Sequence, residues 1–291
     1  MLLQENLQLR RDIFAPHYIL LPVTQQQSHG IPNPMSVRVP APPQSILLTG
    51  ASSGIGEALA LAYAAPGVRL ALGGRHQGRL DAVAEQCRQQ GAEADGRTIN
   101  VTDCDAMRDW IRSAERARAI DLVIANAGIS AGTSGGGEAE RQVRLIFDTN
   151  LTGTLNTVHP AIDAMRTRRR GQIAVMSSAA AFRGFPGAPS YSASKAAVRI
   201  YGEALRGMLY RDGIGVSVIC PGFVRSRITA ANQFRMPLLM DADRAAAIIR
   251  RGLAKNKPRI AFPWPTYFAS WLTGALSPGL TDVFFRNLPE K

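Results

Sequence analysis

Residues 46–56 read Ile46-Leu-Leu-Thr-Gly50-Ala-Ser-Ser-Gly54-Ile-Gly56, a short apolar run followed by a glycine-rich turn. A helix-like pattern of apolar residues begins at Gly54. Gly50 permits a tight turn, Gly54 lets backbone N–H groups approach a pyrophosphate, and Gly56 allows the helix to pack closely on the strand. Since the helix N-terminus then faces the turn, the segment predicts a pyrophosphate site formed by Gly50, Ser52, Ser53, Gly54, Ile55 and Gly56.

Beyond this turn, short apolar runs alternate with longer amphipathic runs along most of the chain. We predict strands at residues 46–49, 68–72, 98–101, 122–125, 173–177, 216–220 and 259–262. Apolar residues three and four apart predict helices at residues 54–65, 79–90, 105–117, 138–165 and 190–210. Strands that are apolar throughout, alternating with helices, indicate a parallel sheet covered on both faces. The expected fold class is therefore α/β, with a doubly wound parallel sheet in a single domain.

The chain divides into three parts by composition. Residues 1–44 are rich in proline and lack a steady periodicity, so we expect a mobile N-terminal extension. Residues 45–262 carry the alternating pattern and form the expected catalytic domain. Residues 263–291 are rich in aromatic residues and proline, and we expect this tail to pack on the domain, on another subunit or on a membrane surface. A subunit interface or a lid is the favoured interpretation of the tail.

The composition excludes several protein classes. The 291 residues include only three cysteines, which are widely spaced, and four histidines, so neither a disulfide framework nor a metal site is expected. The chain lacks the run of about 20 apolar residues that a membrane span needs, and its N-terminus lacks the order of a signal peptide. We therefore expect a cytoplasmic protein.

The net charge of +12 is the unusual number in the composition. It admits a nucleic acid, an anionic membrane surface or an anionic ligand as partner. Thirty of the 34 basic residues are arginines, and they are scattered along the chain rather than gathered in a basic arm. We therefore interpret most of the charge as solvated surface and expect no nucleic-acid partner.

A second group of polar residues lies between the fifth predicted strand and the following helix. Tyr191 and Lys195 stand four residues apart in Tyr191-Ser-Ala-Ser-Lys195, so a helix places both on one face. At that separation the lysine ammonium lowers the pKa of the phenol. Ser178 follows the strand, thirteen residues before Tyr191. Its neighbour Ser177 is the rival candidate, since successive strand residues point to opposite faces.

Together these motifs resemble the classical short-chain dehydrogenase/reductase family over about residues 45–261. The shared features are Gly50-x-x-x-Gly54-x-Gly56, Asn126-Ala127-Gly128, Tyr191-x-x-x-Lys195 and Pro221-Gly222. Two positions depart from the family pattern, because Ala125 stands where the family has an Asn and Ser226 where it has a Thr. The resemblance implies a Rossmann-type fold, a nicotinamide dinucleotide cofactor and a catalytic tetrad of Asn150, Ser178, Tyr191 and Lys195.

The resemblance also implies a role for each member of the tetrad. Tyr191 exchanges a proton with the substrate oxygen, which Ser178 holds through a hydrogen bond. Lys195 lowers the pKa of Tyr191 and holds the nicotinamide ribose, and Asn150 holds a water that connects Lys195 to solvent. The cofactor exchanges the hydride. The predicted enzyme is an NAD(P)-dependent oxidoreductase acting on CH–OH groups.

Arg75 indicates which cofactor is preferred. It follows the second predicted strand, where a carboxylate would bind a ribose 2′-hydroxyl, and no acid occurs between Gly67 and Leu80. An arginine at this place pairs with a 2′-phosphate instead. We therefore expect NADP, with NADPH preferred and NAD left open. The other expected cofactor contacts are Asn100 and Val101 at the end of the third predicted strand, Asn126, Ala127, Gly128, Tyr191, Lys195, Pro221, Gly222, Val224 and Ser226.

The region after the sixth predicted strand bears on the substrate. Its apolar and basic residues are Phe234, Met236, Leu238, Leu239 and Met240 with Arg225, Arg227 and Arg235, and Phe182 and Phe185 follow Ser178. One interpretation is that these residues merely cover the pocket or pack against another subunit. The sharper one is a hydrophobic keto or hydroxy substrate, such as an acyl chain with an anionic head that the arginines recognise.

The leading hypothesis is thus NADPH-dependent reduction of a ketone to a secondary alcohol, or the reverse, on a lipid-like substrate. A nonenzymatic dinucleotide-binding regulator on the same fold is the alternative. A third hypothesis is binding to a nucleic acid or a membrane surface through the basic charge. The resemblance further implies a homodimer or a homotetramer.

Overall fold

The computed structural model describes residues 37, 39–130, 137–230, 232 and 236–286. The chain separates into two units, residues 1–36 and 37–291, and all of the described residues belong to the second unit. Most of the predicted extension, 1–44, lies outside the described residues. Its last part contacts the domain, since Nδ2 of Asn256 donates a hydrogen bond to the carbonyl oxygen of Val37 (3.1 Å).

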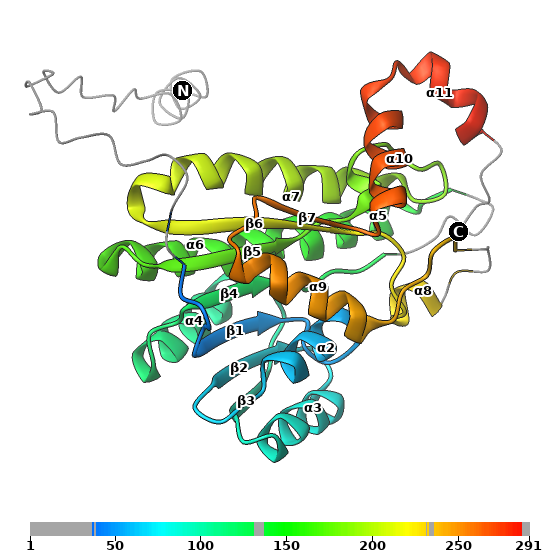
Figure 1. The fold of residues 1–291 in the computed structure, drawn as a ribbon. Helices are drawn as coiled ribbons and strands as arrows, with labels where there is room; N and C mark the ends of the chain where they lie inside the picture. The colour runs from blue at the N-terminus through cyan, green and yellow to red at the C-terminus, as the bar shows by residue number, and fades with distance from the viewer. Residues whose placement is uncertain (1–36, 38, 131–136, 231, 233–235, 287–291) are drawn as a thin grey trace, which may run out of the picture. The chain divides into compact units, whose positions relative to one another are not determined.

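A parallel sheet of seven strands forms the centre of this unit (Figure 1). The strands are β1 (Ser45–Thr49), β2 (Arg69–Gly74), β3 (Glu93–Thr98), β4 (Leu122–Ala125), β5 (Gly171–Met176), β6 (Ile214–Pro221) and β7 (Arg259–Phe262). They lie in the order β3-β2-β1-β4-β5-β6-β7, and every neighbouring pair is parallel. The order reverses between β1 and β4, which leaves a crevice at their carboxyl ends where doubly wound sheets bind ligands. The predicted fold class is confirmed.

Helices cover both faces of the sheet, because alternate residues of each strand point to opposite faces. Leu48 of β1 belongs to the core shared with α2, α3 and α9, whereas Leu47 belongs to the core shared with α4, α6 and α7. The helices are α2 (Gly54–Tyr63), α3 (Gln77–Gln89), α4 (Cys104–Ala117), α5 (Glu140–Phe147), α6 (Gly153–Arg168), α7 (Pro189–Met208), α8 (Arg227–Ala230), α9 (Ala242–Ala254), α10 (Trp264–Ala275) and α11 (Pro278–Phe285).

The third strand lies earlier in the chain than the sequence predicts. β3 spans Glu93–Thr98, whereas the prediction is 98–101. It is an edge strand with mostly exposed polar residues, so it lacks the continuous apolar run of the inner strands. Ile99 and Val101, which suggest a strand, are buried in the loop that follows. Asn100 therefore lies in this loop and not at the end of a strand.

The predicted helix 138–165 is interrupted. α5 ends at Phe147, α6 begins at Gly153, and residues Asp148–Thr152 form one π-helical turn between them. The chain stays helical through this turn, so the spacing of apolar residues does not reveal it. A π-helical turn carries an extra residue and is often found at functional sites.

The aromatic tail forms two helices, α10 and α11, after the edge strand β7. Pro265 and Pro278 lie in their first turns, where the missing backbone N–H would have no partner within the helix. The prolines in the tail thus mark helix starts instead of breaking helices. None of the helices in the described part of the chain is long and apolar enough to cross a membrane.

Candidate active site

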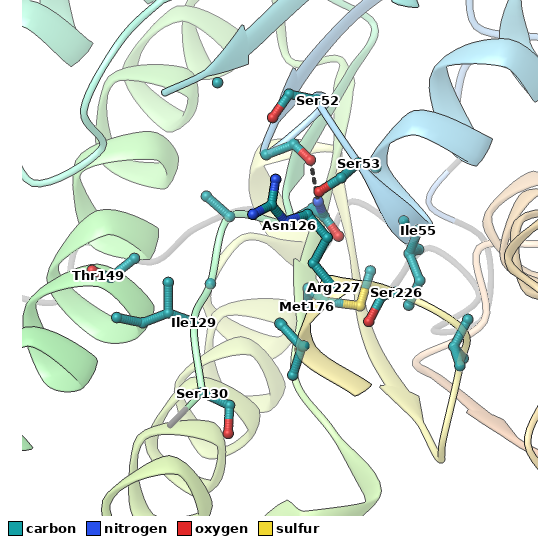
Figure 2. A pocket seen from close by; sticks show the side chains of 18 of the residues that line it. Ser52, Ser53, Ile55, Asn126, Ile129, Ser130, Thr149, Met176, Ser226 and Arg227 are labelled. Carbon is teal, nitrogen blue, oxygen red and sulfur yellow. Dashed lines mark hydrogen bonds between the residues drawn. The ribbon is translucent and has the colours of Figure 1, made fainter. Parts of the chain in front are cut away.

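A pocket of about 400 Å³ lies at the carboxyl ends of β1, β4, β5 and β6, where the strand order reverses. Figure 2 shows side chains of its wall. Every residue predicted to be catalytic or to contact the cofactor lines this pocket except Asn100 and Asn150. Asn100 is exposed, and its Oδ1 accepts a hydrogen bond from the backbone N–H of Thr102 (3.2 Å).

The glycine-rich turn after β1 has no room for a side chain at Gly50, Gly54 or Gly56. Gly54 has a φ of +58°, which residues with a side chain rarely adopt, and a Cβ atom there would lie 2.9 Å from Cβ of Ser226. A Cβ atom at Gly56 would lie 2.1 Å from the carbonyl oxygen of Gly50. The turn therefore presents bare backbone to the pocket, and the N-terminus of α2 adds partial positive charge for an anion.

Asn126 fixes the turn from the neighbouring strand. Its Nδ2 donates hydrogen bonds to the carbonyl oxygens of Thr49 (3.0 Å) and Gly50 (3.2 Å). Its backbone N–H donates to Oγ1 of Thr49 (3.1 Å). These bonds join the end of β4 to the turn after β1 across the crevice.

One end of the pocket is basic, because three of its lining residues follow β2 and carry basic side chains: Arg75, His76 and Arg79. Arg75 is exposed, whereas Arg79 is half-buried. Among the described residues, none makes a hydrogen bond with the buried Nε of Arg79. A buried guanidinium nitrogen without a partner at a pocket wall suits an anionic ligand. Arg79 is not among the residues predicted from the sequence, although an arginine four residues after Arg75 at the start of a helix is a usable signal.

The two serines after β5 have different partners. Ser178 forms a hydrogen bond with the phenol of Tyr191, and its Oγ also accepts one from the backbone N–H of Ala180 (3.1 Å). Oγ of Ser177 instead donates to the carbonyl oxygen of Lys195 (2.8 Å). Both serines line the pocket, and the bond to Tyr191 favours Ser178 over Ser177.

Burial governs the ionisation of Tyr191 and Lys195 at the start of α7. It raises the pKa of Tyr191 above 10.0, and the hydrogen bond from Ser178 offsets part of that rise. It lowers the pKa of Lys195 to about 8. Nζ of Lys195 donates to the carbonyl oxygen of Met176 (2.9 Å) and lies 5.8 Å from the centre of the Tyr191 ring. The predicted cause of a lower Tyr191 pKa is Lys195, whereas in the structure the contact that lowers this pKa comes from Ser178.

Asn150 lies behind the pocket wall. It is fully buried in the π-helical turn, and its Oδ1 accepts a hydrogen bond from the backbone N–H of Ile129 (2.8 Å). Its Nδ2 donates to the carbonyl oxygen of Ile129 and to Oγ of Ser194, both at 3.0 Å. Ile129 lines the pocket, and Ser194 precedes Lys195 on α7. Asn150 thus connects the wall after β4 with the helix that carries Tyr191 and Lys195.

The segment after β6 closes the other side of the pocket. The backbone N–H of Gly222 donates to the carbonyl oxygen of Phe262 (2.7 Å), which fixes the exit from the sheet. Arg227, the first residue of α8, is exposed and lines the pocket. Figure 2 shows its side chain reaching into the pocket toward Asn126. A third arginine therefore lies near the glycine-rich turn.

The comparison with known proteins decides the family. The model of the short chain dehydrogenase family matches residues 44–235. A protein of Myxococcus xanthus named "Uncharacterized oxidoreductase" is 37% identical over 246 residues, which is 84% of this chain and 97% of the relative. The chain belongs to the short-chain dehydrogenase/reductase family. The resemblance in the motifs is thus confirmed, and the protein is an oxidoreductase enzyme of this family.

Other short-chain dehydrogenases/reductases share the length and fold of this one. A candidate ketoacyl reductase of Streptomyces coelicolor is 33% identical over 245 residues, covering 83% of this chain and 93% of its own. A crystal structure from Burkholderia phymatum, in complex with NAD, has a TM-score of 0.72 at 23% identity and covers 85% and 96% of the two chains. One from Sphingobium yanoikuyae, in complex with NADPH, has a TM-score of 0.70 at 23% identity and covers 84% and 96%.

In this short-chain dehydrogenase/reductase, the region predicted to contact substrate divides between several environments. Arg225 is paired with Asp241 (Nε to Oδ1, 2.8 Å) and does not line the pocket. Met240 is buried and Leu238 is exposed. The predicted Phe234 and Arg235 lie outside the described residues.

Phe182 and Phe185 have a role other than the one predicted from their position after Ser178. Phe182 packs edge-on against Tyr267 of α10, with ring centres 5.4 Å apart, and Phe185 packs against Phe285 of α11 at 5.5 Å. Neither phenylalanine lines the pocket. In this short-chain dehydrogenase/reductase they hold the two C-terminal helices against the domain.

Proposed function

We propose that this short-chain dehydrogenase/reductase catalyses the NADPH-dependent reduction of a ketone to a secondary alcohol, or the reverse, on a hydrophobic substrate. The observation that carries the proposal is the hydrogen bond between Ser178 and Tyr191 in the pocket that the glycine-rich turn also lines. A proton donor and an oxygen-binding hydroxyl thus lie beside a site suited to a dinucleotide. The similarity to a candidate ketoacyl reductase supports the reaction class.

The pocket residues fit a dinucleotide that carries a 2′-phosphate. The bare backbone at Gly54 and Gly56 suits the pyrophosphate. The unpartnered Nε of Arg79 and the exposed guanidinium of Arg75 offer donors to a phosphate beyond β2. Among the described residues that line the pocket there is no Asp or Glu to repel such a phosphate. The two glycines support a dinucleotide and the two arginines support NADPH, while the two similar solved proteins are described one with NAD and one with NADPH.

In the proposed reduction, Tyr191 donates its phenolic proton to the substrate oxygen while Ser178 donates a hydrogen bond to the same oxygen. The raised pKa keeps Tyr191 protonated at neutral pH and ready to donate. When bound, the nicotinamide ring supplies the hydride. In the reverse direction Tyr191 accepts the proton, and the hydrogen bond from Ser178 assists because it stabilises the phenolate.

Lys195 and Asn150 are assigned supporting roles, in which Lys195 binds the cofactor and Asn150 positions its neighbours. With a pKa of about 8, Lys195 is mostly cationic at neutral pH, and we assign its ammonium to the nicotinamide ribose hydroxyls. Asn150 positions Ile129 and Ser194. A Cβ atom at Gly128 would lie 3.1 Å from both Oδ1 of Asn150 and Nζ of Lys195, so both groups border one small space. The short separation supports the predicted water shared by Asn150 and Lys195.

The proposed substrate is a hydrophobic ketone or alcohol of the acyl-chain type. Two arginines are described in the segment after β6. Arg225 forms an ion pair with Asp241, whereas Arg227 lines the pocket. Arg227 is therefore the residue that we assign to an anionic group, either of the substrate or of the cofactor. A homodimer or homotetramer and a cytoplasmic location are further proposals from the family resemblance and the composition.

A screen of the purified full chain tests the proposal. We expect NADPH to be oxidised in the presence of ketones, faster with longer chains, and NADH to serve less well. Tyr191→Phe should bind NADPH unchanged and lose turnover. A clear preference for NADH would contradict the assignment of Arg75 and Arg79, and full activity of Tyr191→Phe would contradict the proton transfer. NADPH binding without turnover of any ketone would favour the nonenzymatic regulator.

A further inference from the structure

The two C-terminal helices expose an unusual amount of apolar surface. Twelve large apolar side chains are exposed among the described residues, and eight of them lie in or between α10 and α11. These eight form what we call the C-terminal apolar surface: Trp264, Phe268, Trp271, Leu272, Leu276, Leu280, Val283 and Phe284. Trp264, at 67% exposure, and Phe284, at 73%, are the most exposed. Contiguous apolar surface of this extent marks an interaction site on a folded protein.

The aromatic part of this surface is continuous. The rings of Trp264 and Phe268 stack with centres 5.2 Å apart, and Phe268 lies 6.0 Å from Trp271. These residues follow one side of α10 at intervals of four and three. Tryptophan and other aromatic side chains of this kind are enriched at the headgroup level of membranes, where an apolar ring with a polar edge is favoured.

The other side of the helix pair is held firmly by the domain. Arg183 forms an ion pair with Asp282 (2.8 Å) and lies over the ring of Phe285 (4.9 Å). A Cβ atom at Gly274 would lie 2.1 Å from the carbonyl oxygen of Phe182, so α10 touches the backbone there. Figure 1 shows α10 and α11 standing out beside α7. None of the described tail residues lines the pocket, so the apolar surface is not the inner side of a lid.

Such a surface could bind a second copy of the chain or a lipid bilayer, and charge distinguishes the two. Between Trp264 and Phe285 the only charged residue is Asp282, and Arg183 neutralises it. The whole chain carries +12, so an anionic lipid surface attracts the protein, whereas a second copy seated on this surface would add like charge. The proposed homodimer or homotetramer is therefore assigned to another face. α10 has 12 residues, a length of about 18 Å, too short for the ~30 Å hydrocarbon core. The two helices therefore suit an orientation in the plane of the interface between membrane and water.

We propose that the C-terminal apolar surface docks this protein onto an anionic lipid bilayer, with the side chains of α10 and α11 at the headgroup level. The proposal is independent of the proposed function, because it uses no residue of the pocket. η2 (Ala179–Ala181), which contacts α10, directly follows Ser178, so a docked protein holds the Ser178 side of its pocket near the membrane. An apolar substrate dissolved in the bilayer would then be close to the enzyme.

Co-sedimentation of the full chain with vesicles tests the docking. We expect binding to vesicles of phosphatidylcholine with phosphatidylglycerol, and binding about tenfold weaker or more to phosphatidylcholine alone. Tryptophan emission should shift to shorter wavelength on binding, because Trp264 and Trp271 are exposed and the third tryptophan, Trp110, is buried. The double variant Trp264→Ser, Trp271→Ser should lose both binding and the shift.

A matched control carries the same change on another exposed apolar site. Ile200→Ser with Met208→Ser, at side chains of α7 that are 54% and 56% exposed, should leave vesicle binding unchanged. If the tryptophan variant does not fold, as judged by thermal melting, Leu280→Ser with Phe284→Ser replaces it. Absence of vesicle binding by the wild type overturns the proposal, and so does wild-type dimerisation that the variants abolish without any vesicle binding. Equal binding of the control and the tryptophan variant overturns it as well.

Discussion

Asn150 and Ile129 exchange two hydrogen bonds: the backbone N–H of Ile129 donates to Oδ1 of Asn150 (2.8 Å), and Nδ2 of Asn150 donates to the carbonyl oxygen of Ile129 (3.0 Å). Ile129 follows the end of β4, so the side chain of Asn150 does here what a neighbouring strand does within the sheet. An asparagine suits this task because its amide offers a donor and an acceptor side by side. The pocket wall is thus held by a residue outside the pocket.

Asn150→Ala should lower the free energy of unfolding by about 2 kcal/mol, because it leaves the partly buried N–H and C=O of Ile129 without their partner. Urea unfolding followed by circular dichroism measures this change. Asn156→Ala is the matched control, since Asn156 makes a single bond, to the carbonyl oxygen of Val101 (2.9 Å), and its loss should cost about 1 kcal/mol. Equal losses in the two variants would show that the paired bonds add nothing.

Ser178→Ala should lower kcat by about a hundredfold, because it removes the hydroxyl that we assign to the substrate oxygen. Its neighbour provides the comparison. Ser177→Ala loses the bond to the carbonyl oxygen of Lys195 and should cost about 1 kcal/mol of stability while retaining most of kcat. Steady-state kinetics and urea unfolding of both variants separate the two roles, and a larger loss of kcat in Ser177→Ala would reverse the assignment.

Arg79→Gln should raise the KM for NADPH by about tenfold while changing the KM for NADH little, because only NADPH carries the phosphate that we assign to Arg79. The same change at Arg75 should act in the same direction. Arg112→Gln, on α4 and away from the pocket, is the control and should change neither KM. An equal rise of both KM values in Arg79→Gln would mean that the residue only supports the fold.

The sequence predicts the inner strands well, because β1, β4, β5 and β6 are mostly apolar and buried along their whole length, a pattern typical of strands in a covered parallel sheet. It misplaces β3, because an edge strand with exposed polar residues shows no such run. α10 and α11 also escape prediction, since Pro265 and Pro278 suggest breaks where they occupy first turns. Elements that face solvent are thus the ones that local pattern describes least well.

The candidate site is predictable where its residues belong to one contiguous motif. The glycine-rich turn and the pair Tyr191 and Lys195 are examples, since their spacing alone suggests a shared location. Arg79 and Ile129 are not predictable in this way, because their roles depend on an unpartnered nitrogen and on a contact across 21 residues. The pKa of Tyr191 is set by burial, which the spacing of residues does not express.

The free energy of unfolding of the wild type, taken relative to that of Lys195→Met, should rise with pH between about 8 and 9.5. Burial lowers the pKa of Lys195 from 10.5 to about 8, so in this range the unfolded chain binds more protons than the folded one. Up to pH 10.5, the loss of the buried charge on Lys195 would add roughly 3 kcal/mol to the free energy of unfolding. Burial raises the pKa of the Cys87 thiol to about 11 and that of the Cys220 thiol to about 12, so both thiols act in the opposite direction in this range, but equally in the two proteins. Tyr191, whose pKa is raised, acts in the same direction as the thiols near pH 10, so measurements stop below that. Urea unfolding of the wild type and Lys195→Met at several pH values gives the difference, and a difference that does not change with pH would contradict the lowered pKa of Lys195.

Gly54→Ala should destabilise the protein by more than the cost of a positive φ, because its Cβ atom would lie 2.9 Å from Cβ of Ser226. Removing that second Cβ relieves the overlap and leaves only the backbone strain of about 1 kcal/mol. The double variant Gly54→Ala, Ser226→Gly should therefore be more stable than the sum of the two single changes predicts, by about 1 kcal/mol in a double-mutant cycle. Urea unfolding of the four proteins gives this coupling energy, and a value of zero would mean that the turn after β1 and the start of α8 move apart freely.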